Sequence, residues 1–260
     1  MNLAHVTNAQ KAQILVNALP YIQKYNNKTI VVKYGGNAMT DETLRESVMG
    51  DLVLLRLIGV NVVLVHGGGP HIQEILNKVG KESKFLNGLR VTDEETMKIV
   101  QMVLAGQVNK DLVNLIGMTG GKAVGLCGLD GQMIKVKKQS EELGLVGEIV
   151  SVDVSLIRDN LEKGYIPVIS TIGTDTHGRA YNINADTASA KIAGALHAEC
   201  MLSLTNIDGV LADAADPGSL IKTLTLAEAA QLQADGVIAG GMVPKVTCCT
   251  DAVAAGVKRV

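Results

Sequence analysis

The sequence predicts an α/β protein with a parallel β-sheet, from two apolar strand-like runs, the glycine turns that end them and the helical stretches that follow. Residues 29–36 (TIVVKYGG) and 61–70 (NVVLVHGGGP) are rich in β-branched residues and close on glycines. Residues 41–59 and 71–80 follow them with apolar residues at helical spacing. Strand, glycine turn, helix and strand in succession are typical of parallel strands joined by right-handed crossovers.

The composition limits the classes of function. At 260 residues the chain is one large domain or two closely packed lobes. A hydrophobic share of 47%, a charged share of 19% and a net charge of −2 argue against disorder and against a polyanion-binding surface, so no nucleic acid is expected as a partner. Aromatic residues make up 2%, with Phe85 the single phenylalanine, so the core must be aliphatic and base-stacking platforms are essentially absent.

The same features indicate where the protein works. The start of the chain has no long apolar stretch behind basic residues, and no segment reaches the length of a bilayer, so we expect no membrane association and a cytoplasmic location. Four cysteines without C-x-x-C spacing are expected to be reduced structural thiols, and two of them, Cys248 and Cys249, lie in a helical stretch. No linker or repeat interrupts the chain, which favours two lobes that share one continuous sheet.

The remaining elements follow in order along the chain. An amphipathic helix over 9–25, with a kink expected at Pro20, precedes the first strand and is expected to pack on the core in preference to a neighbouring subunit. Residues 132–139 and 144–152 form a short antiparallel excursion. Further strands are predicted at 123–131, 165–173 and 200–211, and further helices at 94–117, 153–163, 184–197, 226–235 and 243–256.

Three consecutive glycines, Gly67, Gly68 and Gly69, follow the second strand. Their backbone N–H groups and the positive end of the next helix would serve an anion or a transferring group. The alternative is a tight strand-to-helix connection without a ligand. Neither G-x-G-x-x-G nor G-x-x-x-x-G-K-[ST] occurs, which argues against a dinucleotide-binding fold of the usual type and against a P-loop.

Three cations are candidates for anion binding. Lys33, at the end of the first strand, offers a point charge to a phosphate, or is a surface lysine whose stem covers apolar neighbours. Lys245 comes early in a helix after Gly240 and Gly241, where a cation is electrostatically disfavoured, so a task such as contact with nucleotide phosphates is predicted. Arg90 offers a planar fork to a small carboxylate, or is a solvated surface residue.

The segment before the helix at 184–197 is rich in polar groups. Asn184 or Asp186 could simply cap that helix. Alternatively, Asn182 orients a substrate while Asp186 holds catalytic lysines in place. His66, which precedes the three glycines, is expected to pack or to hydrogen bond locally, without a catalytic role.

Six motifs occur in order from about Thr29 onward: KYGG, VHGGGP, NGLRVTD, NINADTAS, LTNIDGVL and GGMVPKV. In these motifs the chain resembles the amino acid kinase family. The resemblance implies a three-layer αβα sandwich around a mainly parallel central sheet. It also implies a kinked oligomerisation helix in residues 1–28, an N-terminal lobe for the amino-acid substrate in residues 29–180 and a C-terminal ATP-binding lobe in residues 181–260.

Within that family the chain is similar to the members that phosphorylate the γ-carboxylate of N-acetyl-L-glutamate with MgATP. The products would be N-acetyl-L-glutamyl 5-phosphate and ADP, in the second step of arginine biosynthesis. A carboxylate is already nucleophilic at neutral pH, so the task is to bring two anions together by positioning and charge compensation. Mg²⁺ would be held mainly by the nucleotide phosphates, with no metal site of the protein's own.

The resemblance also implies roles for individual residues. Lys33 and Lys245 would stabilise charge on the transferring phosphoryl group, and Asp186 would organise both amines. Arg90 and Asn182 would hold the α-carboxylate of the substrate. Backbone amides near the reacting groups would come from Gly36, Gly68 and Gly69, and the adenine nucleotide site would be lined by Asn206, Ile207, Asp208, Gly209, Val210 and Leu211.

The N-terminal helix resembles that of arginine-inhibited, hexameric family members. This implies a homo-oligomer (a dimer or a hexamer), feedback inhibition by arginine, and a PII-type signalling protein as a further candidate partner. The chain departs from the family pattern at two places. In the nucleotide lobe, family members usually carry Asp at the position of Asn206, and in one connecting strand they often have a Ser-Gly-Lys run where this chain has LCGLDG. Relatives continue beyond GVKRV through a strand and a segment of the arginine site, so a truncated C-terminus is expected.

Two other functions compete with this interpretation. One is a sibling kinase that acts on carrier-linked aminoadipate, glutamate, aspartate or carbamate, although Arg90 disfavours carbamate, which has no α-carboxylate. The other is a non-catalytic regulatory subunit that binds a ligand. The presence of Lys33, Arg90, Asp186 and Lys245 together opposes the second alternative.

Overall fold

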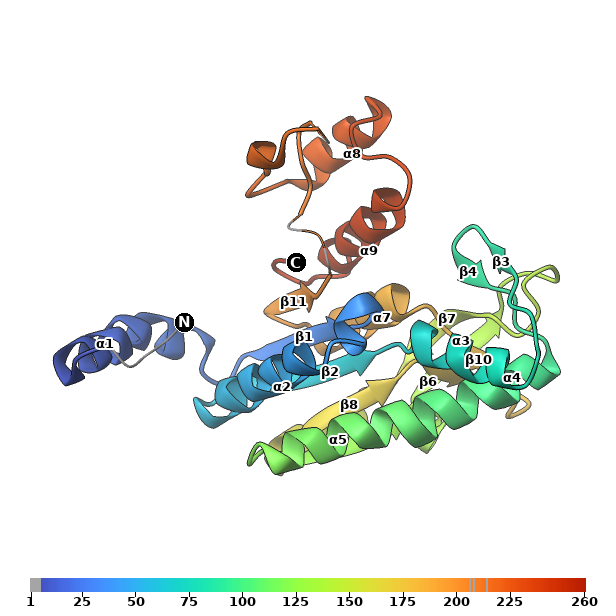
Figure 1. The fold of residues 1–260 in the computed structure, drawn as a ribbon, viewed down its shortest axis with the longest axis horizontal. Coiled ribbons are helices and arrows are strands. Elements are labelled where there is room, and N and C mark those ends of the chain that lie inside the picture. The colour runs from blue at the N-terminus through green and yellow to red at the C-terminus, as the bar shows by residue number, and fades with distance from the viewer. Residues whose placement is uncertain (1–5, 206, 208, 214) are drawn as a thin grey trace.

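A parallel five-stranded sheet forms the centre of the molecule. The structure is a computed structural model, and it describes residues 6–205, 207, 209–213 and 215–260. The strand order is β11-β1-β2-β8-β5, and all four pairings are parallel (Figure 1). The strands are β1 (Thr29–Tyr34), β2 (Asn61–His66), β5 (Ala123–Cys127), β8 (Ile166–Ser170) and β11 (Cys200–Ser203).

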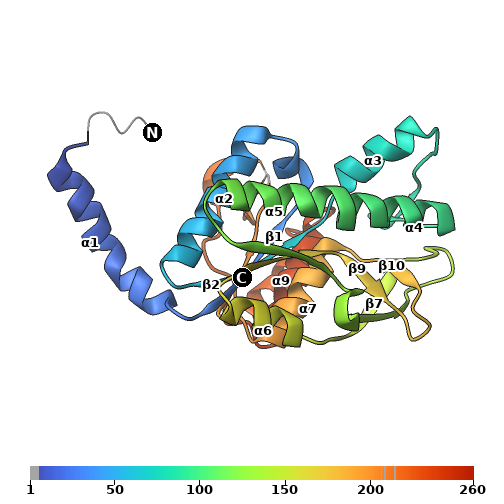
Figure 2. The same ribbon diagram turned by 90° about the horizontal axis from the view of Figure 1, so that it is seen from below.

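Helices cover both faces of this sheet. α2 (Glu42–Leu57) and α5 (Asn109–Met118) lie on one face, and α6 (Ser155–Glu162) and α7 (Ala185–Leu196) lie on the other (Figure 2). α9 (Met242–Ala254) packs against α7. The three layers, with a parallel sheet between helices, confirm the predicted fold class.

The core is aliphatic, as the composition predicts. The central strand β2 is buried from Val62 to Val65 with no exposed surface, which is typical of a parallel sheet covered on both faces. A second, smaller apolar cluster joins α8 (Leu226–Ala234) to α9 through Ala229, Ile238 and Val246. This cluster stands apart from the main core.

Four shorter strands form a second sheet in the order β10-β9-β6-β7. They are β6 (Ile134–Lys138), β7 (Gly147–Val152), β9 (Ile172–Thr174) and β10 (Ala180–Asn182). The antiparallel pairing of β6 and β7 confirms the predicted excursion. The single strand predicted at 165–173 is wrong in one respect, because the chain leaves β8 after Ser170 and pairs as β9 with β10. The predicted boundary between the two lobes, at residues 180 and 181, falls inside β10. The division into two lobes stays a prediction.

The helix predicted at 94–117 contains a segment of another type. α4 (Glu94–Gln101) runs into the π-helix η3 (Met102–Val108), and η3 runs into α5. Asp93 caps the start, where its carboxylate accepts a hydrogen bond from Thr96 N at 2.7 Å. π-helical turns often occur at functional sites, and this one lies beside the glycine turn described below.

A two-residue hairpin replaces the loop expected around Arg90. β3 (Phe85–Leu86) pairs antiparallel with β4 (Leu89–Arg90) across Asn87 and Gly88, whose φ angles are 51° and 80°. Positive φ at both central residues is the geometry that Asn-Gly favours in tight hairpins. The remaining elements are α3 (Gly69–Lys78) and the short 3₁₀ segments η2 (Gly36–Met39), η4 (Asp130–Gln132) and η5 (Pro217–Ser219).

The N-terminal helix α1 (Asn8–Tyr25) projects away from the body of the molecule (Figure 1). None of its residues is buried, and Leu15 is 70% exposed, so the expectation that it packs on the core is wrong. The segment between α1 and β1 sets the direction of the helix. Asn27 in this segment adopts a left-handed φ of 57°, and its N–H donates a hydrogen bond to Gly59 O. No helix in the described part of the chain is long and apolar enough to cross a bilayer.

Candidate active site

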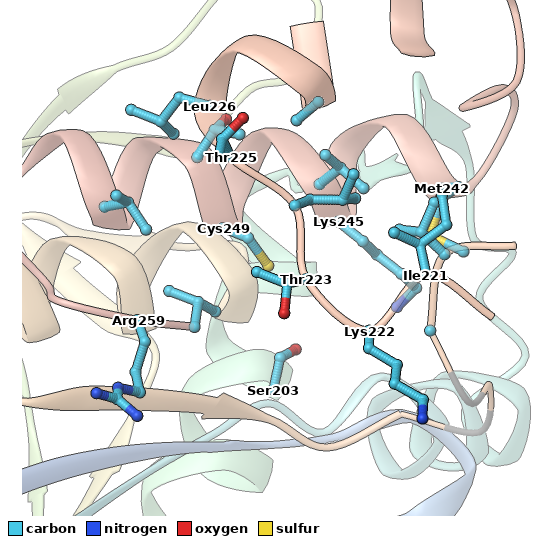
Figure 3. A pocket seen from close by; sticks show the side chains of 18 of the residues that line it. Ser203, Ile221, Lys222, Thr223, Thr225, Leu226, Met242, Lys245, Cys249 and Arg259 are labelled. Atoms are coloured by element: carbon cyan, nitrogen blue, oxygen red, sulfur yellow. The ribbon is translucent and has the colours of Figure 1, made fainter. Parts of the chain in front are cut away.

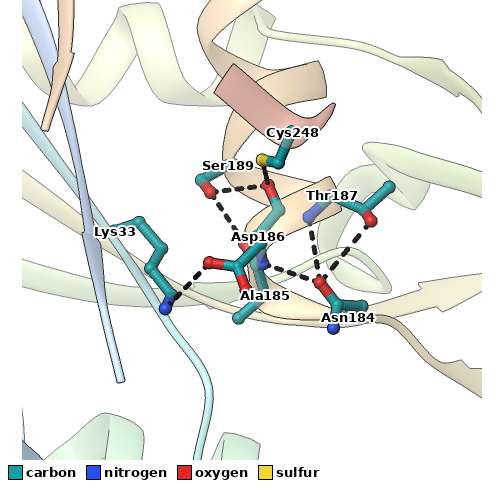
Figure 4. A network of polar contacts seen from close by, with 7 residues as sticks. All are labelled: Lys33, Asn184, Ala185, Asp186, Thr187, Ser189 and Cys248. Atoms are coloured by element: carbon teal, nitrogen blue, oxygen red, sulfur yellow. Dashed lines mark hydrogen bonds and ion pairs between the residues drawn. The ribbon is translucent and has the colours of Figure 1, made fainter. Parts of the chain in front are cut away.

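Lys33 and Asp186 meet at the carboxyl end of β1. Lys33 Nζ lies 2.8 Å from Asp186 Oδ1, and the Lys33 side chain is only 8% exposed (Figure 4). Burial of an ammonium group is costly unless it is paired and hydrogen bonded. The surface lysine considered from the sequence is therefore wrong for Lys33, and its amine faces the start of α7.

The start of α7 holds Asp186 in place. Asn184 is the N-cap, and its Oδ1 accepts hydrogen bonds from Asp186 N at 2.9 Å and Thr187 N at 3.1 Å. A carboxylate in the first turn is favoured by the helix dipole. Capping thus belongs to Asn184, and Asp186 directs its carboxylate to Lys33 (Figure 4).

A thiol joins α9 to the same helix. Cys248 Sγ donates a hydrogen bond to Asp186 O at 2.7 Å (Figure 4). Burial first, and the Asp186 carboxylate next, raise the pKa of Cys248 to about 12, so this thiol stays a neutral donor. The four cysteines are free thiols, as the sequence predicts. Because Lys245 lies one turn before Cys248 on α9, this contact fixes the helix that carries Lys245.

Lys245 lines a cavity of about 910 Å³ between α9, the end of β11 and residues 221–226 (Figure 3). Ile207, Gly209 and Val210 of the predicted nucleotide segment also line it. Leu211 is not among the lining residues and instead bridges to Leu220. Asn206 and Asp208, also assigned to this segment, lie outside the described residues.

Lys33 lies next to the strand that ends at this cavity. Lys33 is in register with Ser203, which lines the cavity. Burial, and then the Asp186 carboxylate, raise the pKa of Cys249, while Lys245 and Lys33 both lower it. Cys249 lines the cavity, and both amines influence its pKa. Among the ion pairs of the described residues, Asp186 joins Lys33 and not Lys245.

Sequence reasoning missed several groups that the cavity brings together. Lys222, Thr223 and Thr225 come from the segment before α8 and line the cavity together with Lys245 (Figure 3). Arg259 also lines it. Lys222, Thr223 and Thr225 belong to the stretch IKTLT, which has one cation and two hydroxyl groups. No glycine turn follows it, so the sequence pattern did not indicate a site.

The glycine turn lies at the same end of the sheet. Gly68 is the N-cap of α3, and no side-chain cap occupies the first N–H groups of this helix. A Cβ atom on Gly68 would lie 2.5 Å from Leu104 Cδ2 of η3, so the close approach of this helix requires glycine. Gly69 is exposed with open space beside it. Gly36, in the other glycine turn, is exposed at the start of η2 with a φ of 67°.

Arg90 is buried beside the glycine turn, with 8% exposure, which excludes the solvated alternative. Its Nη1 atom donates to Gln73 Oε1 at 2.9 Å and to Ser83 Oγ, and its Nη2 atom donates to Gly69 O at 3.2 Å. The guanidinium also lies 4.7 Å from the centre of the Phe85 ring. Protein acceptors thus hold the guanidinium at the start of α3, and burial lowers its pKa.

Asn182 is linked to Arg90 through one threonine. Asn182 Nδ2 donates to Thr92 Oγ1 at 3.3 Å, and Thr92 Oγ1 donates to Arg90 O at 2.7 Å. Thr92 is fully buried. The structure thus brings the two residues assigned to an α-carboxylate into one hydrogen-bonded chain.

His66 is buried at the end of β2. Its Nδ1 atom lies 2.8 Å from Gly67 O, and its Nε2 atom lies 3.1 Å from Asn109 Nδ2. Burial lowers the pKa of His66 to about 4, so the ring is neutral at physiological pH. The local hydrogen bonding expected for His66 is confirmed.

The site also has to be compatible with Mg²⁺, which kinases use with ATP. In the part of the chain that the structure describes, no group of three His, Cys, Asp or Glu side chains could hold a metal ion. The carboxylate of Asp186 is paired with Lys33. The site consists mainly of lysines and backbone amides, which bind phosphate oxygens and not Mg²⁺. This composition is compatible with a Mg²⁺ ion that is bound by the nucleotide phosphates.

Comparisons with known proteins agree with this geometry. The model of the Amino acid kinase family matches residues 28–260. A protein of Clostridioides difficile (strain 630) named acetylglutamate kinase is 55% identical over 254 residues, which cover 97% of this chain and 89% of that relative. The protein of the same name from Clostridium kluyveri (strain ATCC 8527 / DSM 555 / NBRC 12016 / NCIMB 10680 / K1) is 54% identical over 249 residues, covering 95% of this chain and 88% of the relative.

A solved structure with another named activity shares the fold at lower identity. The N-acetylglutamate synthase from Neisseria gonorrhoeae, complexed with coenzyme A and N-acetyl-glutamate, matches with a TM-score of 0.82 and 25% sequence identity. The match covers 95% of this chain and 56% of that chain.

Proposed function

Because this chain belongs to the amino acid kinase family, we propose that it transfers the γ-phosphoryl group of ATP to the γ-carboxylate of N-acetyl-L-glutamate. It is a phosphotransferase with a carboxyl acceptor, and its main function lies in arginine biosynthesis. The observation that carries the proposal is the Lys33–Asp186 ion pair at the carboxyl end of β1, beside both glycine turns and near the cavity that Lys245 lines.

The reaction forms one bond and breaks one bond. A γ-carboxylate oxygen attacks the γ-phosphorus, the bond from that phosphorus to the β,γ-bridging oxygen breaks, and ADP leaves with the bonding electrons. No proton has to be removed from the nucleophile, so a general base is unnecessary. The barrier comes from repulsion between anions, and positioning with charge compensation lowers it.

The chain's own groups supply that compensation. Lys33 would face the equatorial oxygens of the transferring group from the β1 side, while Lys245 would face the β- and γ-phosphates from α9. Asp186 holds the Lys33 amine in position. The Gly68 and Gly69 amides, at the positive end of α3, would receive the charge that develops on the phosphoryl oxygens. Mg²⁺, when bound to the nucleotide, would neutralise part of the phosphate charge.

Substrate selection is assigned to two sites. Arg90 and Asn182 would bind the α-carboxylate of the acid, and the roughly 910 Å³ cavity would hold the adenine nucleotide, with Ile207, Gly209 and Val210 in its wall. Asn206, Asp208, Leu211 and Gly36 complete the proposed nucleotide contacts. Because the reaction consumes ATP in a biosynthetic pathway, we place it in the cytoplasm.

Regulation and assembly extend the proposal. A homo-oligomer, either a dimer or a hexamer, would use α1, whose apolar residues are exposed. Arginine is proposed as a feedback inhibitor, and a PII-type signalling protein as a partner. Turnover measured with and without arginine tests the inhibition, and an arginine-independent rate would remove it from the account.

An assay with a panel of acids tests the proposed substrate. Purified protein is given MgATP with N-acetyl-L-glutamate, L-glutamate, L-aspartate, L-2-aminoadipate or carbamate, and ADP release is followed. We expect turnover with N-acetyl-L-glutamate at a kcat/KM at least about 100-fold above the others, and none with carbamate, which has no α-carboxylate for Arg90 and Asn182 to bind. Turnover of L-glutamate but not of its N-acetyl form would contradict the assignment.

A further inference from the structure

Each carbonyl group of the glycine turn accepts a hydrogen bond from the protein. The bonds run from His66 Nδ1 to Gly67 O at 2.8 Å, from Ile72 N to Gly68 O at 2.9 Å and from Arg90 Nη2 to Gly69 O at 3.2 Å. In a trans peptide the carbonyl and the next N–H point in opposite directions, and the described residues contain no cis peptide. The bond from His66 therefore sets the direction of the Gly68 N–H group.

The partners of His66 determine where its proton resides. Gly67 O can only accept, so Nδ1 must carry hydrogen. Asn109 Nδ2 can only donate, so Nε2 must be the acceptor. The orientation of the Asn109 amide is fixed independently, because Nδ2 donates to Val168 O at 2.9 Å while Lys110 Nζ donates to Oδ1 at 3.1 Å. These contacts select one neutral tautomer of His66.

The π-helix connects this pair to the glycine turn. Asn109 follows η3 directly and is only 1% exposed. Its amide donates to the carbonyl of Val168 on β8, the strand that pairs with β2, so it ties the start of α5 to the central sheet. Leu104 of η3 packs on Gly68, where a Cβ atom would be 2.5 Å from its Cδ2. The turn is held by hydrogen bonds on one side and by packing on the other.

We propose that His66 is a positioning residue, which directs the Gly68 N–H toward the transferring phosphoryl group by holding the carbonyl of Gly67. Asn109 keeps His66 in the tautomer that can do so. The role in catalysis rests on the proposed kinase function, whereas the orientation of the peptide does not. His66 touches neither substrate in this arrangement, and its effect is transmitted through one peptide group.

Two substitutions at position 66 test the catalytic part. His66→Leu removes the donor to Gly67 O, and kcat for N-acetyl-L-glutamate should fall about 100-fold, with both KM values changing less than about threefold. His66→Asn can place a side-chain amide donor where Nδ1 lies and should restore at least about tenfold of that loss. His177→Leu, an exposed histidine in a turn, is the matched control and should leave kcat unchanged.

The results separate the possible failures. If the unmodified protein turns over and His66→Leu keeps its kcat, or if His66→Asn is as slow as His66→Leu, the positioning role is wrong. If the unmodified protein shows no turnover, the proposed function fails. The positioning geometry is then tested without activity, by ¹⁵N NMR of labelled histidines, which should show His66 protonated on Nδ1 at neutral pH. Protonation on Nε2 would overturn it, and this readout requires no substitution that could impair folding.

Discussion

The Lys33–Asp186 ion pair joins the end of β1 to the first turn of α7. Each was identified from its place in a motif, Lys33 at a strand end and Asp186 before a helix. Their distance of 2.8 Å depends on the pairing of β1 with its neighbours and on the packing of α7 across β1. Asp186 was expected to hold both lysines, and the structure pairs it with Lys33, but this geometry could not be predicted because long-range pairing leaves no periodic signal in one sequence.

Replacement of Lys33 should affect turnover more than binding. Lys33→Met keeps the volume of the side chain but removes the charge and leaves Asp186 unpaired. We expect kcat to fall at least about 100-fold, because the amine acts on charge that develops in the transition state. Steady-state kinetics measure this, with Lys191→Met on the exposed side of α7 as control. A kcat within twofold of the parent protein would exclude Lys33 from the mechanism.

Two neighbouring glycines should respond differently to alanine. Gly68→Ala places a methyl group against Leu104, which must shift within a packed core, so the free energy of unfolding should fall by about 1–3 kcal/mol. Gly69→Ala meets open space at the start of α3 and should leave stability unchanged or raise it by up to about 1 kcal/mol. Denaturant unfolding measures both. Equal effects would contradict the close approach of η3 to Gly68.

At the scale of elements, long periodic segments were predicted well and short special ones were not. The strands of the parallel sheet and the helices α2 to α9 follow apolar spacing that is visible in the sequence. The π-helix η3 was missed, because its apolar residues fit a helical pattern of either type and tertiary contacts decide between them. The β3–β4 hairpin had a signal, the Asn87-Gly88 dipeptide, which was interpreted only as a loop.

The hairpin gives a prediction for substrate binding. Gly88 has a φ of 80°, which costs a residue with a Cβ atom roughly 1–2 kcal/mol. Gly88→Ala should therefore distort β4 and move Arg90 from its acceptors, which raises the KM for N-acetyl-L-glutamate while the KM for ATP stays within about twofold. Asn87→Gly is the control, because glycine adopts the positive φ of position 87 without strain and should leave the hairpin in place. A change in the ATP constant alone would contradict the assignment of Arg90 to the acid.

At the scale of the whole molecule, two features could not be deduced from the sequence alone. The amphipathic pattern of α1 resembles that of any surface helix, so its projection away from the core had no signal. The cavity depends on the packing of β11, α9 and residues 221–226, which lie far apart in the chain. The helix position of Lys245 predicted contact with nucleotide phosphates, and the family resemblance assigned residues 206–211 to the nucleotide site.

The exposed helix leads to a prediction about assembly. If α1 joins subunits, Leu15→Glu should lower the oligomeric mass, because it places a charge among the exposed apolar residues Ile14, Val16 and Leu19. Gln13→Glu on the same helix changes the charge without loss of apolar surface and is the control. Light scattering coupled to size-exclusion chromatography measures the mass. An unchanged mass for both variants would exclude α1 from the interface.

The buried histidine makes the stability of the whole chain depend on pH. The pKa of His66 is about 4 when folded, against an ordinary value of 6.5, because burial disfavours the cation. Between these pH values the unfolded chain binds a proton that the native ring does not, so stability is complete above about pH 6.5 and declines as the pH falls toward 4. The total contribution is on the order of 3 kcal/mol.

Denaturant unfolding across this pH range measures the effect, and His66→Asn should remove most of the slope. Besides the Asn109 amide, the charged groups that act on the ring are His71 and Lys110, which lower its pKa further. The pKa of Asp93, lowered to about 2 mainly by its hydrogen bond with Lys81, affects stability only below about pH 4 and does not interfere. An equal slope in both proteins would contradict a buried neutral His66.

Trapping of the acyl phosphate tests the central claim most directly. The protein is incubated with ATP, Mg²⁺, N-acetyl-L-glutamate and hydroxylamine, and the hydroxamate is identified by mass, with Lys33→Met in parallel. We predict stoichiometric hydroxamate and ADP from the parent protein and at most about 1% of that rate from the variant. ADP release without hydroxamate, or equal hydroxamate from both proteins, would contradict a carboxyl phosphotransferase that depends on the Lys33–Asp186 pair.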